Sequence, residues 1–527
     1  MQSTHDENAH GLIQAISMLV SQQTIDTAIL EAKQYNQSLL HHLIQEKILS
    51  SSEIANACAT YFNVDYVDLS TYHYNQLPIE HVSKKWLEKY ILLPLTLKEQ
   101  SLLIAISDPN HFHLIEEIKF QTKLTVKFVI ASYEQLTFLI NKILSQQFYA
   151  SNHQPIVKLI DRILTDAIYQ QASDVHFEST DKGYRIRARI DGILTHLHQL
   201  SAELSMAIAS RLKVMANLDI AEKRLPQDGR FSFRTKTNLI RDCRLSTCPT
   251  IYGEKLVIRI LNPQKKLLSL NQLGLTKKQK QHFLHSLKKP QGLILVTGPT
   301  GSGKTISLYA ALNSLDATQK NILTIEDPVE IQLNHINQVN TNYKAGLDFL
   351  HALRAFLRQD PDIIMVGEIR DHETATMAIR AALTGHLVLS TLHTNSAAEA
   401  LTRLIDMGIP HYHIASAVNL IIAQRLLRKL CVHCKTPSQQ THDMQTQYHD
   451  PQPCQFCTNG YLGRMGVFEV LPISPAIREL ILSHQPAHKL STQAEEEGME
   501  TLWQAALNKV YAGITSLEEI HRVIEKR

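Results

Sequence analysis

The chain has 527 residues, which is too long for one hydrophobic core, so we expect roughly three or four domains. Apolar residues make up 44% and charged residues 20%, a composition typical of packed globular structure rather than disorder. The formal net charge of +3 is close to balance, which argues against a protein whose whole surface binds nucleic acid.

The N-terminal sequence MQSTHDENAH is polar and acidic, so it lacks the basic-then-apolar order of a signal peptide. No apolar run approaches the ~18 residues that a membrane span requires. We therefore expect a cytoplasmic protein, and any contact with a membrane must run through a partner.

The first two domains are expected to contain both helices and strands. Residues 1–148 begin with helical spacing from about residue 11 to 60, followed by strands in ILLPLTLKEQSLLIAISDP and a helix in SYEQLTFLINKIL. A polar linker, 149–155, follows. A helix then leads into SDVHFEST, YRIRARIDGIL, RDCRLSTC and EKLVIRIL, whose alternation predicts a sheet-containing second domain over 156–262.

The pattern changes after a lysine-rich connector, in residues 272–527. GLILVTG, NILTIED, PDIIMVGE and HLVLSTLHT are short apolar strands separated by helical patterns. This order predicts a mostly parallel sheet with helices on both faces, and an α/β multidomain protein as a whole.

The segment GPTGSGKT matches the P-loop pattern GxxxxGK[ST], and it lies between the strand LILVT and the helical KTISLYAAL. Such a loop curls so that its amides and the helix N-terminus face phosphate. Lys304 would reach the β and γ phosphates, and Thr305 would bind Mg²⁺. The predicted nucleotide-binding residues of the loop are Gly298, Pro299, Thr300, Gly301, Ser302, Gly303, Lys304 and Thr305.

Acidic residues or a histidine follow three of the predicted strands, where ligands bind in open α/β sheets. They are Glu326, Asp327 and Glu330 after NILTI, Glu368 after IIMVG, and His393 after LVLSTL. A P-loop ATPase needs one carboxylate for Mg²⁺ and another to orient or deprotonate water. We assign Glu368 to the metal shell and the base to the 326–330 cluster, and we place Glu326 among the nucleotide-binding residues.

Two histidines bracket one predicted strand. His386 and His393 are seven residues apart, about 23 Å in an extended strand, so both cannot reach one phosphate. We expect His393 to sense the nucleotide and His386 to have a structural or interface role.

Four of the seven cysteines form two CxxC pairs with zinc-site spacing, namely Cys431, Cys434, Cys454 and Cys457. Four thiolates leave no open position for catalysis, so the predicted zinc site is structural. His433, His442 and His449 could compete as ligands, and a redox pair is the main alternative. We expect the remaining cysteines to be inert thiols, and these are Cys58, Cys243 and Cys248.

Several motifs occur together in one order: KRLPQDGR, GPTGSGKT, TIEDPVE, LRAFLRQDPDIIMVGEIRD, TGHLVLSTLHTN and the paired CxxC segments. In this the chain resembles the type II secretion and type IV pilus assembly ATPases, strongly from about residue 155 onward. The resemblance implies a homo-hexameric motor with a RecA-like core, a preceding PAS-like α/β domain, an N-terminal α/β domain and a zinc knuckle over 428–460 that helps engage an inner-membrane platform.

The resemblance also implies roles for single residues. Lys304 and Thr305 match the Walker A loop, Glu368 an atypical Walker B strand, and Glu330 the catalytic carboxylate of the Asp box. Arginines of the family match four positions here, which are Arg244, Arg259, Arg354 and Arg358. We expect the last two, four residues apart, to share one helix face and neutralise phosphate charge.

The sequence departs from the family pattern in two places. Ile306 and Ser307 stand where relatives often carry Thr, and we expect little consequence. NQS replaces the RLG that begins cyclic-di-GMP-binding segments in some relatives, so we do not predict that ligand.

The leading hypothesis is therefore a motor that uses ATP, Mg²⁺ and Zn²⁺ to extend a type IV pilus, with a type II secretion ATPase as the alternative. Two hypotheses from other classes stay open. A nucleic-acid translocase would need a basic, aromatic-rich channel. A nonhydrolysing scaffold would need the carboxylates to be idle.

Overall fold

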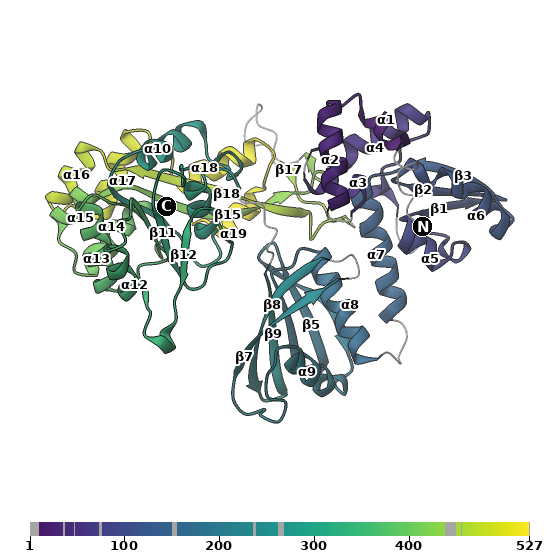
Figure 1. The fold of residues 1–527 in the computed structure, drawn as a ribbon, viewed down its shortest axis with the longest axis horizontal. Coiled ribbons are helices and arrows are strands. Elements are labelled where there is room, and N and C mark those ends of the chain that lie inside the picture. The colour runs from purple at the N-terminus through teal and green to yellow at the C-terminus, as the bar shows by residue number, and fades with distance from the viewer. Residues whose placement is uncertain are drawn as a thin grey trace. The chain divides into compact units, whose positions relative to one another are not determined.

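A computed structural model describes residues 10–34, 37–46, 48–72, 76–149, 155–235, 239–261, 268–437, 449–454 and 456–525. Its contacts divide the chain into two compact units (Figure 1). The first holds the residues up to 170 with the short segment 454–458, and the second holds the rest. This division into two units does not coincide with the predicted domain boundaries and does not test them. Those boundaries therefore stay predictions.

The first unit combines helices with a small sheet of order β1-β2-β3. Helix α4 illustrates why its helices begin where they do, because Ser50 and Glu53 form a capping box. The elements are α1 (His10–Ile16), α2 (Gln22–Gln34), α3 (Leu39–Gln45), α4 (Ser51–Phe62), α5 (Lys84–Tyr90), β1 (Leu93–Lys98), β2 (Ser101–Ile106), α6 (Leu114–Thr122), β3 (Thr125–Ile130), α7 (Tyr133–Tyr149) and α8 (Ile156–Tyr169). The helices and strands expected here are confirmed.

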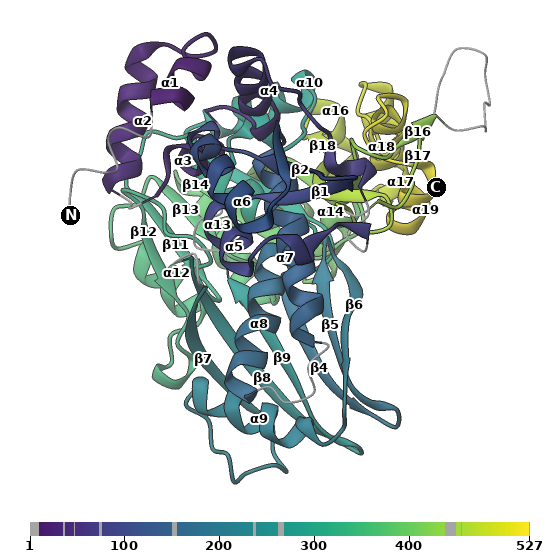
Figure 2. The same cartoon turned by 90° about the vertical axis from the view of Figure 1, so that its right-hand side faces the viewer.

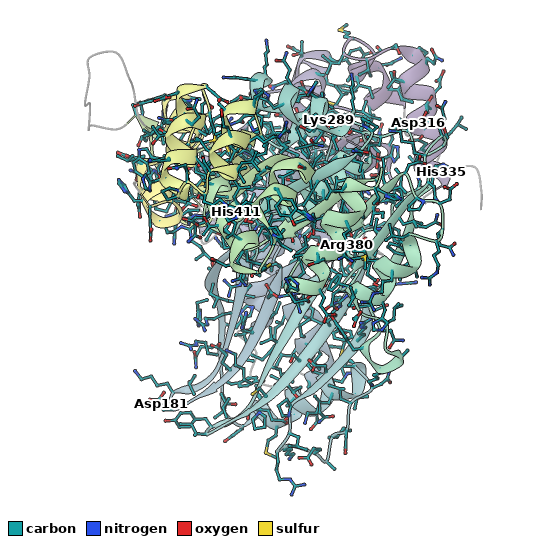
Figure 3. The ribbon with its side chains drawn as sticks, turned by 90° about the vertical axis from the view of Figure 1, so that its left-hand side faces the viewer. Asp181, Lys289, Asp316, His335, Arg380 and His411 are labelled. Carbon is teal, nitrogen blue, oxygen red and sulfur yellow. The ribbon has the colours of Figure 1, made fainter. Side chains whose placement is uncertain are left out.

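The second unit begins with an antiparallel sheet of order β6-β5-β4-β9-β8-β7, whose strands lie side by side in Figure 2. Side chains of β5 alternate between buried and half-buried positions, as the sequence pattern predicts for a strand with one covered face. Asp181, labelled in Figure 3, lies in the turn between β4 and β5. The elements are β4 (Asp174–Thr180), β5 (Gly183–Ile190), β6 (Ile193–Leu200), α9 (Leu204–Met215), β7 (Gln227–Arg234), β8 (Ile240–Thr250) and β9 (Gly253–Leu261).

A larger sheet of order β12-β11-β13-β14-β10-β15-β18 follows, and it is parallel except for β18. Leu293 and Leu295 of β10 pack into one core, while Ile294 and Val296 pack into another. Both faces are therefore covered, which confirms the predicted parallel α/β architecture.

The elements of this part are α10 (Lys277–Leu287), β10 (Gly292–Thr297), α11 (Lys304–Leu312), β11 (Ile322–Glu326), β12 (Asn337–Asn340), α12 (Phe349–Phe356), β13 (Ile363–Val366), α13 (His372–Leu383), β14 (Leu387–Leu392), α14 (Ala397–Asp406), α15 (His411–Ala417), β15 (Val418–Leu430), β16 (Thr436–Pro437), β17 (His449–Asp450), β18 (Tyr461–Pro472), α16 (Pro475–Leu482), α17 (Ala487–Glu496), α18 (Leu502–Tyr511) and α19 (Leu517–Val523). Short 3-10 helices lie at Leu69–Thr71, Ile79–His81, Pro109–His113, Leu270–Gln272 and Tyr343–Ala345. None of the helices within the described ranges is long and apolar enough to cross a bilayer.

A buried ion pair fastens α19 to β15. Nε and Nη2 of Arg428 donate to Oε2 of Glu519 at 2.9 and 2.7 Å, and the Arg428 amide donates to Oε1 at 3.0 Å. Arg522 also donates to this carboxylate, and the Arg428 guanidinium lies 3.8 Å from the ring centre of Tyr461. Burial opposes ionisation of Glu519, but hydrogen bonds from Arg522 and Arg428 outweigh it and hold its pKa below the usual value.

The Arg428→Ala variant should lower the free energy of unfolding of this part by about 3–5 kcal/mol, because it leaves the Glu519 carboxylate buried without its main partner. Arg522→Ala is the comparison and should cost less, because the Arg522 side chain is 44% exposed and Arg428 would keep its three hydrogen bonds to the carboxylate. Urea denaturation, with hydrogen exchange across β15 and α19, measures both.

Since the folded pKa of Glu519 is depressed, the pair's contribution should be present above about pH 4.3 and fade as pH falls further. Equal losses of unfolding free energy in Arg428→Ala and Arg522→Ala would contradict the assignment of Arg428 as the main partner of Glu519.

Candidate active site

The P-loop joins the end of β10 to the start of α11, and its shape depends on glycine. Gly298 has φ of 149°, and a β-carbon there would lie 2.5 Å from the carbonyl oxygen of Gln424. Gly303, at φ of 88°, provides the left-handed residue before α11. Other residues at these two positions would displace β15 or strain the loop.

Lys304 lies at the first position of α11 and is turned toward the loop. Its Nζ donates to the carbonyl oxygens of Gly298 at 2.8 Å and Pro299 at 3.1 Å. Burial lowers the pKa of Lys304 to about 8, the charge of Glu368 opposes that shift, and the charge of Arg425 adds to it. The lysine thus lies in surroundings that would be stabilised by a further negative charge.

The residues of this loop fit a phosphate group. The Ser302 hydroxyl is buried and makes no hydrogen bond with the part of the chain that the structure describes. The loop also precedes the N-terminus of α11, where unpaired amides and the helix dipole favour an anion. Thr305, in the first turn, is half-buried and could offer its hydroxyl to Mg²⁺.

Glu368 and His393, expected at neighbouring strand ends, are brought together. Glu368 follows β13 and accepts a hydrogen bond from Arg370, and Nε2 of His393 lies 3.4 Å from its other oxygen. Because β10, β13 and β14 are parallel strands of one sheet, the residues that follow their carboxyl ends, among them Lys304, Glu368 and His393, lie at one edge of it. His386 lies at the opposite end of β14, where Nδ1 is 3.0 Å from the Ala381 carbonyl oxygen. This placement agrees with separate roles for the two histidines.

The acidic residues after β11 occupy three different environments. Glu326 is buried, and burial raises its pKa despite hydrogen bonds from Thr324, Tyr309 and Gln338. Asp327 accepts hydrogen bonds from the hydroxyls of Thr341 and Tyr343, each at 3.0 Å. Glu330 is exposed. Of the two glutamates, Glu330 is therefore the one whose carboxylate can reach an external ligand.

Arginines of the antiparallel sheet face each other in a row. Arg244 of β8 is paired in register with Arg259 of β9 and with Arg230 of β7. Burial lowers the pKa of Arg244, the two neighbouring arginines lower it further, and the charges of Glu330 and Asp327 oppose the shift. The predicted Arg244 and Arg259 therefore belong to a row whose Arg244 is close enough to Glu330 for their charges to interact.

The expectation for Arg354 and Arg358 is corrected in one respect. Helix α12 ends at Phe356, so Arg358 lies in the turn after the helix, where its amide donates to the Ala355 carbonyl oxygen at 3.0 Å. Nη1 of Arg358 donates to the Arg354 carbonyl oxygen at 3.0 Å, and both residues are exposed. No hydrogen bond or ion pair joins either guanidinium to the P-loop among the described residues.

Sequence reasoning missed the polar residues of β15. Gln424 accepts a hydrogen bond from Ser307 of α11 at 2.7 Å. The Arg425 guanidinium donates to the Gln424 carbonyl oxygen and to Asn395. Ser307, one of the two departures from the family pattern, therefore attaches α11 to β15. The signal in the sequence was the pair QR inside the apolar run VNLIIAQRLLRKL. Arg370, which donates to Glu368, and Arg230, which is paired in register with Arg244, were also missed.

The cysteines of the two CxxC pairs come together as predicted. The sulfur atoms of Cys431, Cys434, Cys454 and Cys457 all lie within 4.8 Å of one another, and no histidine of the described residues joins the cluster. Cys431 is buried and the other three are half-buried. Four soft sulfur ligands in this arrangement fit tetrahedral Zn²⁺. His442 lies outside the described residues, while Cys58 and Cys243 are buried thiols whose pKa values burial raises to about 12.

Known proteins resemble this chain over most of its length. The profile of the family described as Type II/IV secretion system protein matches residues 149–522, and that of the MshEN domain matches residues 62–149. The type IV pilus assembly ATPase PilB of Pseudomonas aeruginosa is 43% identical over 96% of each chain. The type II secretion system ATPase E of Vibrio cholerae is 45% identical over 71% of this chain and 76% of its own.

Among solved structures, the Legionella pneumophila ATPase DotB covers 71% of this chain and 96% of its own, with a TM-score of 0.53 and 21% identity. That likeness supports the fold. The resemblance predicted from the motifs is confirmed by the sequence relatives. The chain therefore belongs to the Type II/IV secretion system protein family, which includes the ATPases of pilus assembly and type II secretion.

Proposed function

We propose that this chain is the ATP-hydrolysing motor that extends a type IV pilus, working as a homo-hexamer at an inner-membrane platform. ATP hydrolysis is supported by one observation: Glu368 lies 3.4 Å from His393 beside the P-loop, and its charge acts on the P-loop lysine, Lys304. Pilus extension is favoured by relatives named for it that align over the first domain as well as the rest.

The type II secretion ATPase is the second candidate. Its support is the 45% identity with the Vibrio cholerae protein, which is as high as that of the pilus relatives but extends over less of the chain. We also propose that the chain is cytoplasmic, that it forms a homo-hexamer and that it binds an inner-membrane platform protein. Failure to bind cyclic-di-GMP stays a prediction, because the MshEN match concerns residues 62–149 and not the NQS segment.

In the proposed reaction the P-loop amides and Lys304 hold the terminal phosphates of ATP. Thr305 and Glu368 would hold Mg²⁺, which supplies charge stabilisation for the transferring phosphoryl group. Glu330 orients or deprotonates the attacking water, since its carboxylate is exposed beside the arginine row. Arg244 and Arg259 balance charge that develops on phosphate, and His393 senses the nucleotide through Glu368.

Replacing the P-loop lysine provides the main test. Lys304→Ala should reduce the steady-state ATPase rate by about 100-fold or more, since it removes the buried charge that faces the phosphates. Lys277→Ala, at the exposed start of α10, is the matched control and should leave the rate unchanged. Oligomer size is recorded on the same samples. An inactive wild-type hexamer, with Mg²⁺ and zinc present, would favour a scaffold, and stimulation by nucleic acid would favour a translocase.

Nucleotide binding should take up a proton at alkaline pH. The free Lys304 loses its proton above about pH 8, and phosphate favours the charged form, so binding must restore that proton. Affinity for ADP should therefore fall by up to about tenfold per pH unit above pH 8. Calorimetry in two buffers of different ionisation enthalpy measures the uptake. Lys304→Ala should bind without it, and equal uptake in both proteins would assign the proton elsewhere.

Zinc should be present in proportion to the chain and should be held by the cysteine cluster. Cys431→Ser should release it, because a hydroxyl is a poor replacement for a thiolate ligand. Elemental analysis of the purified protein measures the metal. Cys248→Ser, at the exposed cysteine outside the cluster, is the control and should retain zinc. A disulfide detected by mass in metal-free native protein would support the redox alternative instead.

A further inference from the structure

The loop between β11 and β12 carries Glu330, and its backbone is held by side chains from elsewhere. Glu330 itself is exposed, and its side chain is not what fixes the loop. The amide groups of residues 329, 330 and 333 each donate to a side-chain oxygen that belongs to another element. The position of the Glu330 carboxylate therefore depends on those oxygens.

Tyr309 supplies the contact from the nucleotide side. It lies on α11, five residues after Lys304, which is about 7.5 Å of helical rise. Its side chain is fully buried, and its hydroxyl accepts a hydrogen bond from the Glu330 amide at 3.2 Å. The same hydroxyl donates to Glu326. One side chain thus joins the helix that begins at the P-loop to the backbone of Glu330.

Strand β12 supplies the contacts from the other side. Oδ1 of Asn340 accepts from the Val329 amide at 2.7 Å. Oε1 of Gln338 accepts from the Leu333 amide at 2.7 Å, while its Nε2 donates to the Ile331 carbonyl oxygen at 3.1 Å. Since Gln338 and Asn340 are two residues apart on a strand, they share a face, and that face holds the loop.

Glu326 orients both sets of contacts. Its carboxylate accepts from the Tyr309 hydroxyl, from Nε2 of Gln338 at 3.1 Å and from the Thr324 hydroxyl at 2.6 Å. It is only 3% exposed. A carboxylate occupied by three donors in the interior is placed to direct neighbouring side chains, whereas a ligand for external Mg²⁺ would need an open oxygen.

We infer that Tyr309, Gln338 and Glu326 are positioning residues for ATP hydrolysis, which hold the backbone around Glu330 in a fixed place relative to α11. This inference rests on the proposed function of Glu330. It assigns Glu326 to the support of the catalytic loop and gives Tyr309, which belongs to none of the sequence motifs, a role in turnover. Catalytic carboxylates lose activity steeply when they shift, even by about 1 Å.

Tyr309→Phe tests this inference with the least change in packing, since it removes only the hydroxyl. The kcat for ATP should fall by about tenfold or more, while KM and the Kd for ADP stay within about twofold, because the P-loop is untouched. Hydrogen exchange should become faster in a peptide covering residues 329–333. Tyr412→Phe, at an exposed tyrosine of α15, is the matched control and should match wild type in kcat, KM, the Kd for ADP and hydrogen exchange.

Glu330→Gln and Lys304→Ala, measured beside these variants, separate the inference from the proposed function. An inactive wild-type hexamer would contradict the proposed function itself. If wild type is active and Glu330→Gln is not, a Tyr309→Phe protein with unchanged kcat would overturn the inference. An equal loss of kcat and ADP affinity would also overturn it, because that is the result of general disruption. Should Tyr309→Phe fail to fold, Gln338→Ala, at a half-buried position, must show the same split between kcat and KM.

Discussion

The approach of one strand to the P-loop determines the geometry of the nucleotide site. The Gln424 carbonyl passes Gly298 so closely that no side chain fits between them, and the Gln424 amide group lies where a β-carbon on Gly303 would be 2.9 Å away. The same side chain accepts a hydrogen bond from Ser307. A single residue of β15 therefore contacts both ends of the loop and the helix after it. The glycines are required because of this neighbour as much as for their dihedral angles.

Lys304 and the arginine row of β7, β8 and β9 carry positive charges that a polyanion would stabilise. Lys304 is satisfied by carbonyl oxygens of its own loop and lies in surroundings that disfavour its charge. Arg244 is flanked in register by Arg230 and by Arg259, whose Nε also donates to Asp174 at 3.1 Å, and both neighbouring charges lower the pKa of Arg244. Both groups would be relieved by the same polyanion.

The sequence was sufficient for features that depend on local pattern. The P-loop, the parallel strands and the cysteine cluster each follow from short motifs with a physical reason for their spacing, and the structure contains all of them. It was insufficient where contacts join distant segments. Tyr309 occupies a position typical of an apolar helix residue, and only the fold shows that its hydroxyl meets residues 326 and 330. Arg358 was expected within a helix but lies in the turn after α12, because the spacing of apolar residues does not fix a helix end to within one or two residues.

Strand β15 runs from beside the P-loop toward the cysteine cluster, and it ends at Leu430, one residue before Cys431, after an irregularity in its pairing between Arg428 and Leu430. From Gln424 to Cys431 is seven residues, about 23 Å along a strand. β10 pairs with β15 only as far as Ala423, so the stretch from Gln424 onward is bonded to β18 alone, and the Arg428–Glu519 pair joins that stretch to α19. Movement of this stretch along the strand axis would have to break its hydrogen bonds to β18 and separate a buried ion pair. A displacement at the cysteine end of β15 would therefore act through these contacts on Gln424, the residue that lies against the phosphate-binding loop.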